Sequence, residues 1–107
     1  MVTIQWISTK NQTGLDLRIR GHAGGKKGQD LVCAATSILA YTAAETARQL
    51  HRQGVVAQAP YLYLAPGWCQ ISVAEGKAHF APLRTGFSLL AGQYPNQVKL
   101  EDYEVKA

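Results

Sequence analysis

The stretch LDLRIRGHAGGKKGQDLVCAATSIL, residues 15–39, changes its hydrophobic period halfway along and so decides the fold. Leu15, Leu17 and Ile19 alternate with charged residues, which is the period-two pattern of a half-buried strand. From residue 31 onward the apolar side chains recur every three or four positions, which predicts an amphipathic helix. That helix is expected to run to about Gln53, because Gly54 is a typical helix terminator. A strand and a long helix, joined by a glycine-rich loop, are the frame for the other elements.

The chain before this stretch predicts a second strand. Val2, Ile4 and Trp6 alternate with more polar neighbours, and residues 10–14 suit a hairpin loop. The first two strands are therefore expected to pair.

The chain after the long helix continues with short apolar runs that are separated by turn signals. Pro66 and Gly67 suit the central positions of a type II turn, and Pro95 is expected to stop a second helix. The predicted elements are strands over 61–64 and 68–74, a helix over 80–94 and a strand over 97–105. The order β-β-α-β-β-α-β predicts an α+β fold, with an antiparallel or mixed sheet packed with two helices.

Length and composition fit one soluble domain over residues 1–107. The chain has 47% hydrophobic and 17% charged residues, which is ordinary for a globular protein. No apolar run is long enough for a bilayer, and the first residues alternate like a strand rather than forming a signal peptide. We therefore expect a cytoplasmic protein without a membrane partner. Both cysteines should be free thiols in that compartment.

The net charge of +4 would favour acidic partners. The eleven Lys and Arg residues are scattered, however, and Lys26-Lys27 is the one adjacent pair. A nucleic-acid footprint usually clusters its positive charge, so this distribution argues against direct nucleic-acid binding.

The candidate chemistry lies around the glycine-rich loop. Asp30 is expected just before the first helical residue, where a carboxylate caps free backbone N–H groups. Cys33 would then stand at the third helical position, where the helix dipole favours the thiolate. His22 follows the preceding strand and can serve as the base for such a nucleophile, while Ser37 lies one turn after the cysteine on the same face.

Each of these residues also has a structural interpretation. A histidine beside a glycine turn is commonly a solvated loop residue, and a cysteine in an alanine-rich helix is commonly core packing. Asp30 is a helix cap in either case, and Ser37 alone would be a small packing residue. The spacing of the four together is what supports catalysis. Cys69 is interpreted as core, and His51 and His79 are given no catalytic role. The spacing needed for a zinc site is missing, as are the two glycine-rich phosphate-binding motifs.

The motifs GHA and GQDLVCAATS resemble the active-site signature of the ribosomal-processing cysteine protease family of small bacterial proteins. The late segment LLAGQYPNQVKL looks like the C-terminal part of that family, and the order of elements fits along essentially the whole chain. The resemblance implies a cysteine endopeptidase that removes a short N-terminal extension from a large-subunit ribosomal protein. It also implies a homodimer that needs no metal or cofactor.

Carried over to this chain, the resemblance makes Cys33 the nucleophile and His22 the general base, with Asp30 and Ser37 in supporting roles. It also implies a loop that closes over substrate as a lid. The glycines that would act as its hinges are Gly21, Gly24, Gly25 and Gly28. The loop reads GGKK where the family leads one to expect an aromatic or acidic residue, so its contacts with substrate can differ.

An alternative hypothesis is a non-catalytic ribosome-assembly factor whose loop grips a peptide or RNA. Binding by such a factor would survive loss of the thiol, and it would be sensitive to salt if the ligand were RNA.

Overall fold

The computed structural model describes residues 1–22 and 29–105, with the side chains at positions 10, 29 and 30 outside the description. The predicted element order is confirmed. Strands are β1 (Val2–Ser8), β2 (Leu15–Arg20), β3 (Tyr61–Ala65), β4 (Trp68–Val73) and β5 (Val98–Glu104), and the long helices are α1 (Gln29–Arg52) and α2 (Ala81–Gln93). Short 3-10 helices lie at η1 (Lys10–Gln12) and η2 (Lys77–Phe80).

The strands form one mixed sheet in the order β3-β4-β2-β1-β5. Neighbouring strands are antiparallel, except that β5 runs parallel to β1 along its other edge, with Val2 opposite Val98. The chain reaches this parallel position through α2, because parallel neighbours need a crossover connection. The N-terminal strand is thereby placed inside the sheet.

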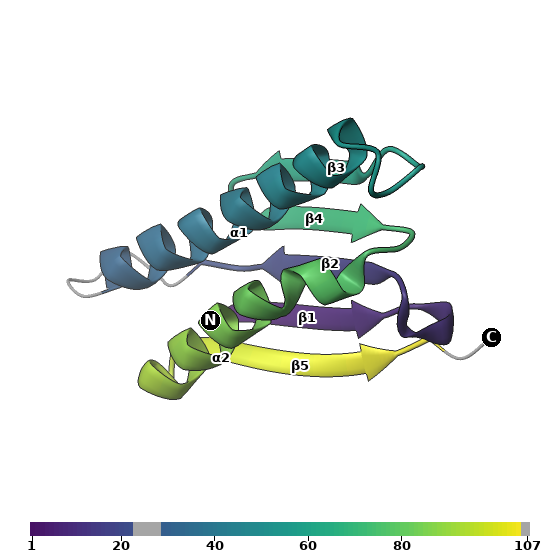
Figure 1. The fold of residues 1–107 in the computed structure, drawn as a ribbon. Helices are drawn as coiled ribbons and strands as arrows, with labels where there is room; N and C mark the ends of the chain where they lie inside the picture. Colours follow the sequence, from purple (N-terminus) through teal and green to yellow (C-terminus); the bar gives the residue numbers. More distant parts are fainter. Residues whose placement is uncertain (23–28, 106–107) are drawn as a thin grey trace.

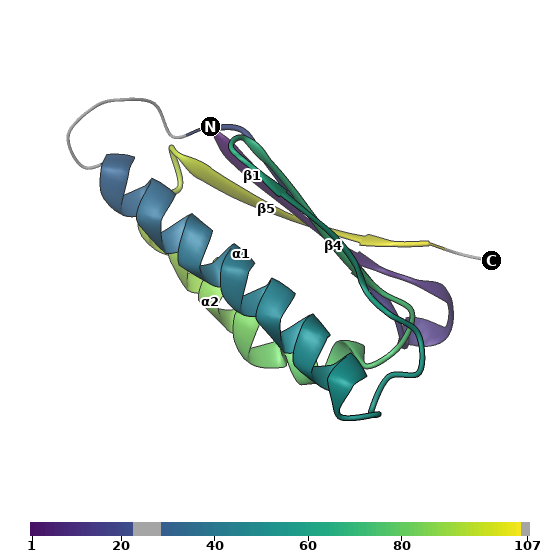
Figure 2. The ribbon, with the colours of Figure 1, turned by 90° about the horizontal axis from the view of Figure 1, so that it is seen from above.

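Both helices cover the same face of the sheet (Figures 1 and 2). The alternating residues of the strands that face them are buried, and Trp6 packs edge-on against Phe87 with ring centroids 6.5 Å apart. Gly86 allows the helices to approach, because a Cβ there would lie 2.8 Å from the Cδ2 of Leu39. The core therefore fills the layer between sheet and helices.

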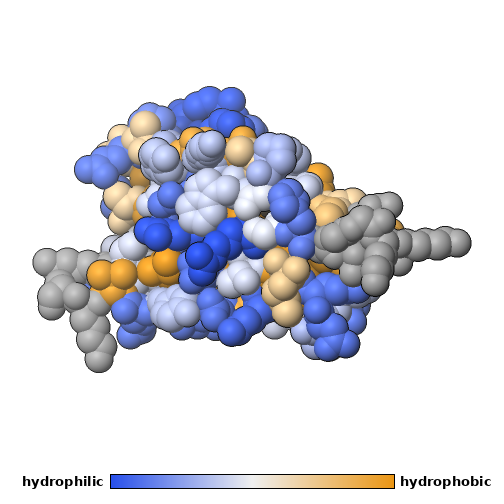
Figure 3. All heavy atoms as spheres, turned by 180° about the vertical axis from the view of Figure 1, so that it is seen from behind, coloured by the Kyte–Doolittle hydropathy of each residue, from blue (hydrophilic) through white to orange (hydrophobic). Residues whose placement is uncertain are grey.

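The opposite face of the sheet is open and carries mainly hydrophilic side chains (Figure 3). Gln5, Arg18 and Gln70 share one row across it, and Arg18 pairs with Asp16 at 2.8 Å. None of the helices in the described part of the chain is long and apolar enough to cross a membrane.

The start of α1 differs from the prediction. The helix begins at Gln29, so Asp30 lies within its first turn rather than before it, and Cys33 is the fifth helical residue rather than the third. The predicted cap position of Asp30 is therefore wrong. A sequence pattern locates helix ends only to within one or two residues, because the first turn lacks intrahelical partners for its N–H groups.

Candidate active site

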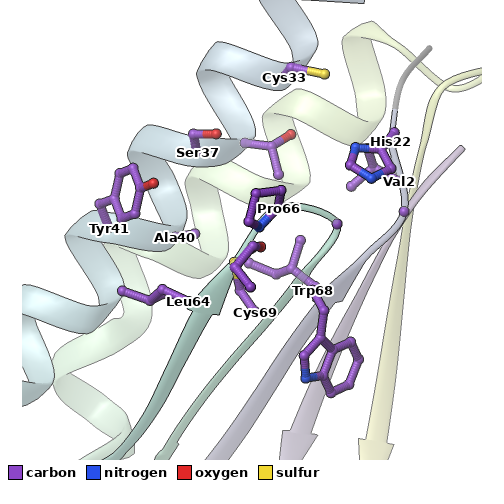
Figure 4. Close-up of a pocket in the computed structure, with 15 residues that line it drawn as sticks. Val2, His22, Cys33, Ser37, Ala40, Tyr41, Leu64, Pro66, Trp68 and Cys69 are labelled. Atoms are coloured by element: carbon purple, nitrogen blue, oxygen red, sulfur yellow. The ribbon is translucent and has the colours of Figure 1, made fainter.

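A pocket of about 320 Å³ opens where β2, the first half of α1 and the β3–β4 turn meet (Figure 4). Cys33, Ser37 and Tyr41 line it from α1, His22 follows β2, and Cys69 comes from β4. The described residues that line this pocket include no Lys, Arg, Asp or Glu. Such a pocket suits an uncharged peptide segment more than a charged small molecule.

Cys33 lies on the rim of the pocket, with its side chain half-buried. Val32, the preceding residue, is fully buried in the core, and the hydroxyl of Thr36 donates to the Val32 carbonyl at 2.7 Å. These neighbours anchor the inner face of the helix and turn the cysteine toward the pocket. Figure 4 shows its sulfur pointing toward the side of the pocket on which His22 lies.

His22 is exposed and stands just beyond the end of β2. Its backbone is held on two sides, because its carbonyl accepts a hydrogen bond from the nitrogen of Met1 at 2.9 Å and the preceding Gly21 N–H donates to the Gly67 carbonyl at 3.0 Å. Gly21 has φ +99°, which a side chain would strain. This backbone fixes where the imidazole enters the pocket.

The arrangement can support nucleophilic catalysis on a carbonyl. A thiol from a helix and an imidazole from a strand end line one cleft, which is the minimum set of groups for thiolate attack with proton transfer. Ser37, one turn along α1 from Cys33, is exposed and lines the same pocket. The predicted residues His22, Cys33 and Ser37 thus lie around one pocket.

Two other parts of the predicted site cannot be placed. The side chain of Asp30 and the loop glycines Gly24, Gly25 and Gly28 lie outside the described residues. Their predicted roles stay predictions.

Sequence reasoning missed two contributions to the pocket. Cys69 packs against the hydrophobic core as expected, but it also lines the pocket, and its thiol donates to the Ala65 carbonyl at 3.7 Å. The turn residues Pro66 and Gly67 form part of the wall. Their Pro-Gly signal predicted a turn correctly, but a local pattern cannot show what a turn will contact.

The fold is similar to that of several solved structures, among them the following three. A comparison with curated protein sequences gave no match. SMU.848 from Streptococcus mutans is 21% identical, with a TM-score of 0.74 over 98% of this chain and 96% of that one. The essential ribosomal processing protease Prp from S. aureus, solved in complex with a substrate peptide, is 16% identical. Its TM-score is 0.73, over 95% of this chain and 99% of that one. The same S. aureus protease, solved with a covalently linked product peptide, is 20% identical. Its TM-score is 0.70, over 95% of this chain and 99% of that one.

These TM-scores show a shared fold, and at such low sequence identities they show the fold alone. The family is shown by the sequence comparison. The family model described as cysteine protease Prp matches residues 1–99, nearly the whole chain. The thiol of Cys33 and the imidazole of His22 on one pocket fit this match, and the protein belongs to the Prp family of cysteine proteases.

Proposed function

We propose that this cysteine protease is an endopeptidase that removes a short N-terminal extension from a large-subunit ribosomal protein. The family match supports the protease activity, and the S. aureus relative of the same fold is a ribosomal processing protease. The observation that carries the assignment of residues is that Cys33 and His22 line a single pocket.

In the proposed mechanism, His22 takes the proton from the Cys33 thiol, and the sulfur attacks the scissile carbonyl carbon. The tetrahedral intermediate then collapses, the C–N bond breaks, and His22 gives its proton to the leaving amine. Water, deprotonated by His22, attacks the resulting thioester and releases the new carboxyl end together with the free thiol. The S. aureus protease forms a covalent link with its product peptide, which is consistent with such a step.

Supporting roles follow from position on α1. Ser37 can hydrogen-bond the substrate, because it is exposed on the pocket wall one turn beyond Cys33. Asp30 lies in the first turn of α1, and we assign it to orienting the histidine or stabilising the helix start. Backbone N–H groups of that first turn are the candidate oxyanion hole. Gly21, Gly24, Gly25 and Gly28 are the proposed hinges of a lid.

We also propose that the enzyme acts in the cytoplasm as a homodimer. The support for a dimer lies on α1, where Leu31, Ile38 and Tyr41 are 65%, 62% and 57% exposed on one side of the helix. Apolar side chains grouped in this way are typical of a surface that another polypeptide covers.

The test is cleavage of a synthetic peptide that carries the N-terminal extension of the ribosomal protein from the same cell. We expect cleavage by the wild type and a loss of at least about 1,000-fold in Cys33→Ala and in His22→Ala. His79→Ala is the matched control for the histidine, because His79 is exposed and does not line this pocket, and it should retain cleavage.

Two results would contradict the mechanism. One is equal cleavage by Cys33→Ala and wild type. The other is peptide binding without cleavage by the wild type, which would favour the non-catalytic factor instead.

A further inference from the structure

The β3–β4 turn lies directly against the histidine of the pocket. Gly67 has φ +81°, and its carbonyl accepts the hydrogen bond from Gly21, the residue before His22. The turn and the histidine segment are therefore tied together along the backbone. Figure 4 shows the His22 ring on the same side of the pocket as the turn that carries Pro66.

The imidazole ring points its tip at the bare Cα of Gly67. A Cβ placed on this glycine would lie 2.5 Å from Nε2 of His22, 3.1 Å from Cε1 and 3.4 Å from Cδ2. The first of these distances is shorter than real Cβ contacts allow, since ordinary van der Waals contact begins near 3.4 Å. The ring thus occupies space that any other residue at position 67 would fill.

Among the described residues, little else restrains the ring of His22. His22 is exposed, and within residues 1–22 and 29–105 no hydrogen bond holds either ring nitrogen. A histidine that acts as a base usually has its ring oriented by a hydrogen-bonding partner. In the described part of this site, the contact with Gly67 of the turn orients the ring in place of a hydrogen-bonding partner.

We propose that Gly67 is a positioning residue for His22, and this inference rests on the proposed role of His22 as the base. The missing side chain lets the ring settle on the turn, where it faces the pocket shared with Cys33. A methyl group at position 67 would push the ring away by about 1 Å, and a displacement of that size can cost on the order of 100-fold in rate. The exposed ring can swing into solvent, so the change should affect catalysis more than folding.

The protein supplies a matched control for this substitution. Gly54 has φ +76°, almost the same backbone conformation, but a Cβ there would meet nothing within 4 Å. Gly67→Ala and Gly54→Ala therefore carry a similar backbone cost, and only the first disturbs His22. We would compare kcat, KM, Tm and the pH dependence of Cys33 alkylation by iodoacetamide in the two variants.

We expect kcat of Gly67→Ala to fall about 100-fold below that of Gly54→Ala, with KM within about threefold. The Tm values should match, and the pH profile of Cys33 alkylation should change in Gly67→Ala alone. Equal kcat values in the two variants would overturn the proposal. It would also be overturned if the lower kcat came with a lower Tm, because the effect would then be structural.

If Gly67→Ala does not fold, the contact between His22 and Gly67 can still be tested by a measurement on the wild-type protein. The NMR spectrum should contain nuclear Overhauser effects between the His22 ring protons and the Gly67 α protons, and their absence would overturn the contact. His22→Ala separates the two hypotheses. If His22→Ala retains full activity, the proposed function fails. If His22→Ala is inactive but Gly67→Ala and Gly54→Ala have equal kcat values, only the positioning role of Gly67 is contradicted.

Discussion

The two halves of α1 have similar buried faces, but their solvent-facing surfaces differ in charge. Val32 and Ala40 are buried in the first half, and Ala47 and Leu50 are buried in the second. Outside, however, residues 31–44 include no charged side chain, whereas Glu45 begins a charged surface that continues to the helix end.

The difference separates two tasks on a single helix. The first half places Cys33 and Ser37 on the pocket. It also exposes large apolar side chains to solvent, and such a surface suits contact with another polypeptide. In the second half, Glu45 pairs with Arg48 at 3.3 Å and Arg52 at 3.0 Å, which keeps the surface solvated. Changes in the first half should therefore affect activity and association, and changes in the second half should affect stability alone.

The largest expected effect comes from the buried side of the second half. Leu50 is 7% exposed, and Leu50→Ala should reduce the free energy of unfolding by about 2–5 kcal/mol through loss of apolar contacts and a residual cavity. Urea denaturation measures this, with Gln49→Ala, an exposed neighbour, as the control. The activity of the folded fraction should not change. A specific loss of activity would show that the two halves are not separate.

The next effect tests the outer face of the first half. Ile38→Lys should weaken self-association by at least about tenfold, because it places a charge where the dimer would bury a side chain. Sedimentation equilibrium measures the dissociation constant. Gln49→Lys, on the outer face of the second half, should leave it unchanged. If both variants associate like the wild type, the apolar face of α1 is not the dimer interface.

A smaller effect is expected at Ser37. Ser37→Ala removes one hydrogen-bonding hydroxyl from the pocket, and we expect kcat/KM to fall by about three- to tenfold. Thr46→Ala, with its hydroxyl bonded to the Thr42 carbonyl at 2.8 Å outside the pocket, should keep the wild-type kcat/KM in the same assay. Equal rates for wild type and Ser37→Ala would remove Ser37 from the mechanism.

The smallest effect concerns the ion pairs of the second half. Desolvation acts to raise the pKa of Glu45, but hydrogen bonds from Arg48 and Arg52 outweigh it, so the pKa lies below its ordinary value. A lowered pKa means that any stabilisation is present at neutral pH and is lost as the pH falls through the acid range. Because these groups are solvated, Glu45→Ala should lower Tm by less than about 4 °C at neutral pH. Calorimetry at neutral and acid pH should show the difference between the two proteins shrinking in acid.

Most of the secondary structure could be read from local patterns. The alternation in β1 and β2 and the helical spacing in α1 and α2 each report one buried face, and a buried face is the property that hydrophobic periodicity measures. The parallel pairing of β5 with β1 was beyond this reasoning, because an alternating strand shows which face is buried but not which strand lies beside it.

The candidate site divides in the same way. His22, Cys33 and Ser37 stood out because they flank a strand end and a helix start, which is local information. The contribution of Cys69 and the contact between Gly67 and His22 join residues far apart in the chain, and no periodicity records such contacts.

The sequence alone was enough to predict the order of strands and helices, the thiol and imidazole around the glycine-rich loop, and the family. These features depend on residues close together in the chain, where side-chain period and turn chemistry act directly. Two other features emerge from the three-dimensional arrangement alone: β1 lies inside the sheet, and the β3–β4 turn meets His22 at the pocket. Those arrangements depend on packing between distant segments, which is set by the shape of the whole core rather than by any one stretch of sequence.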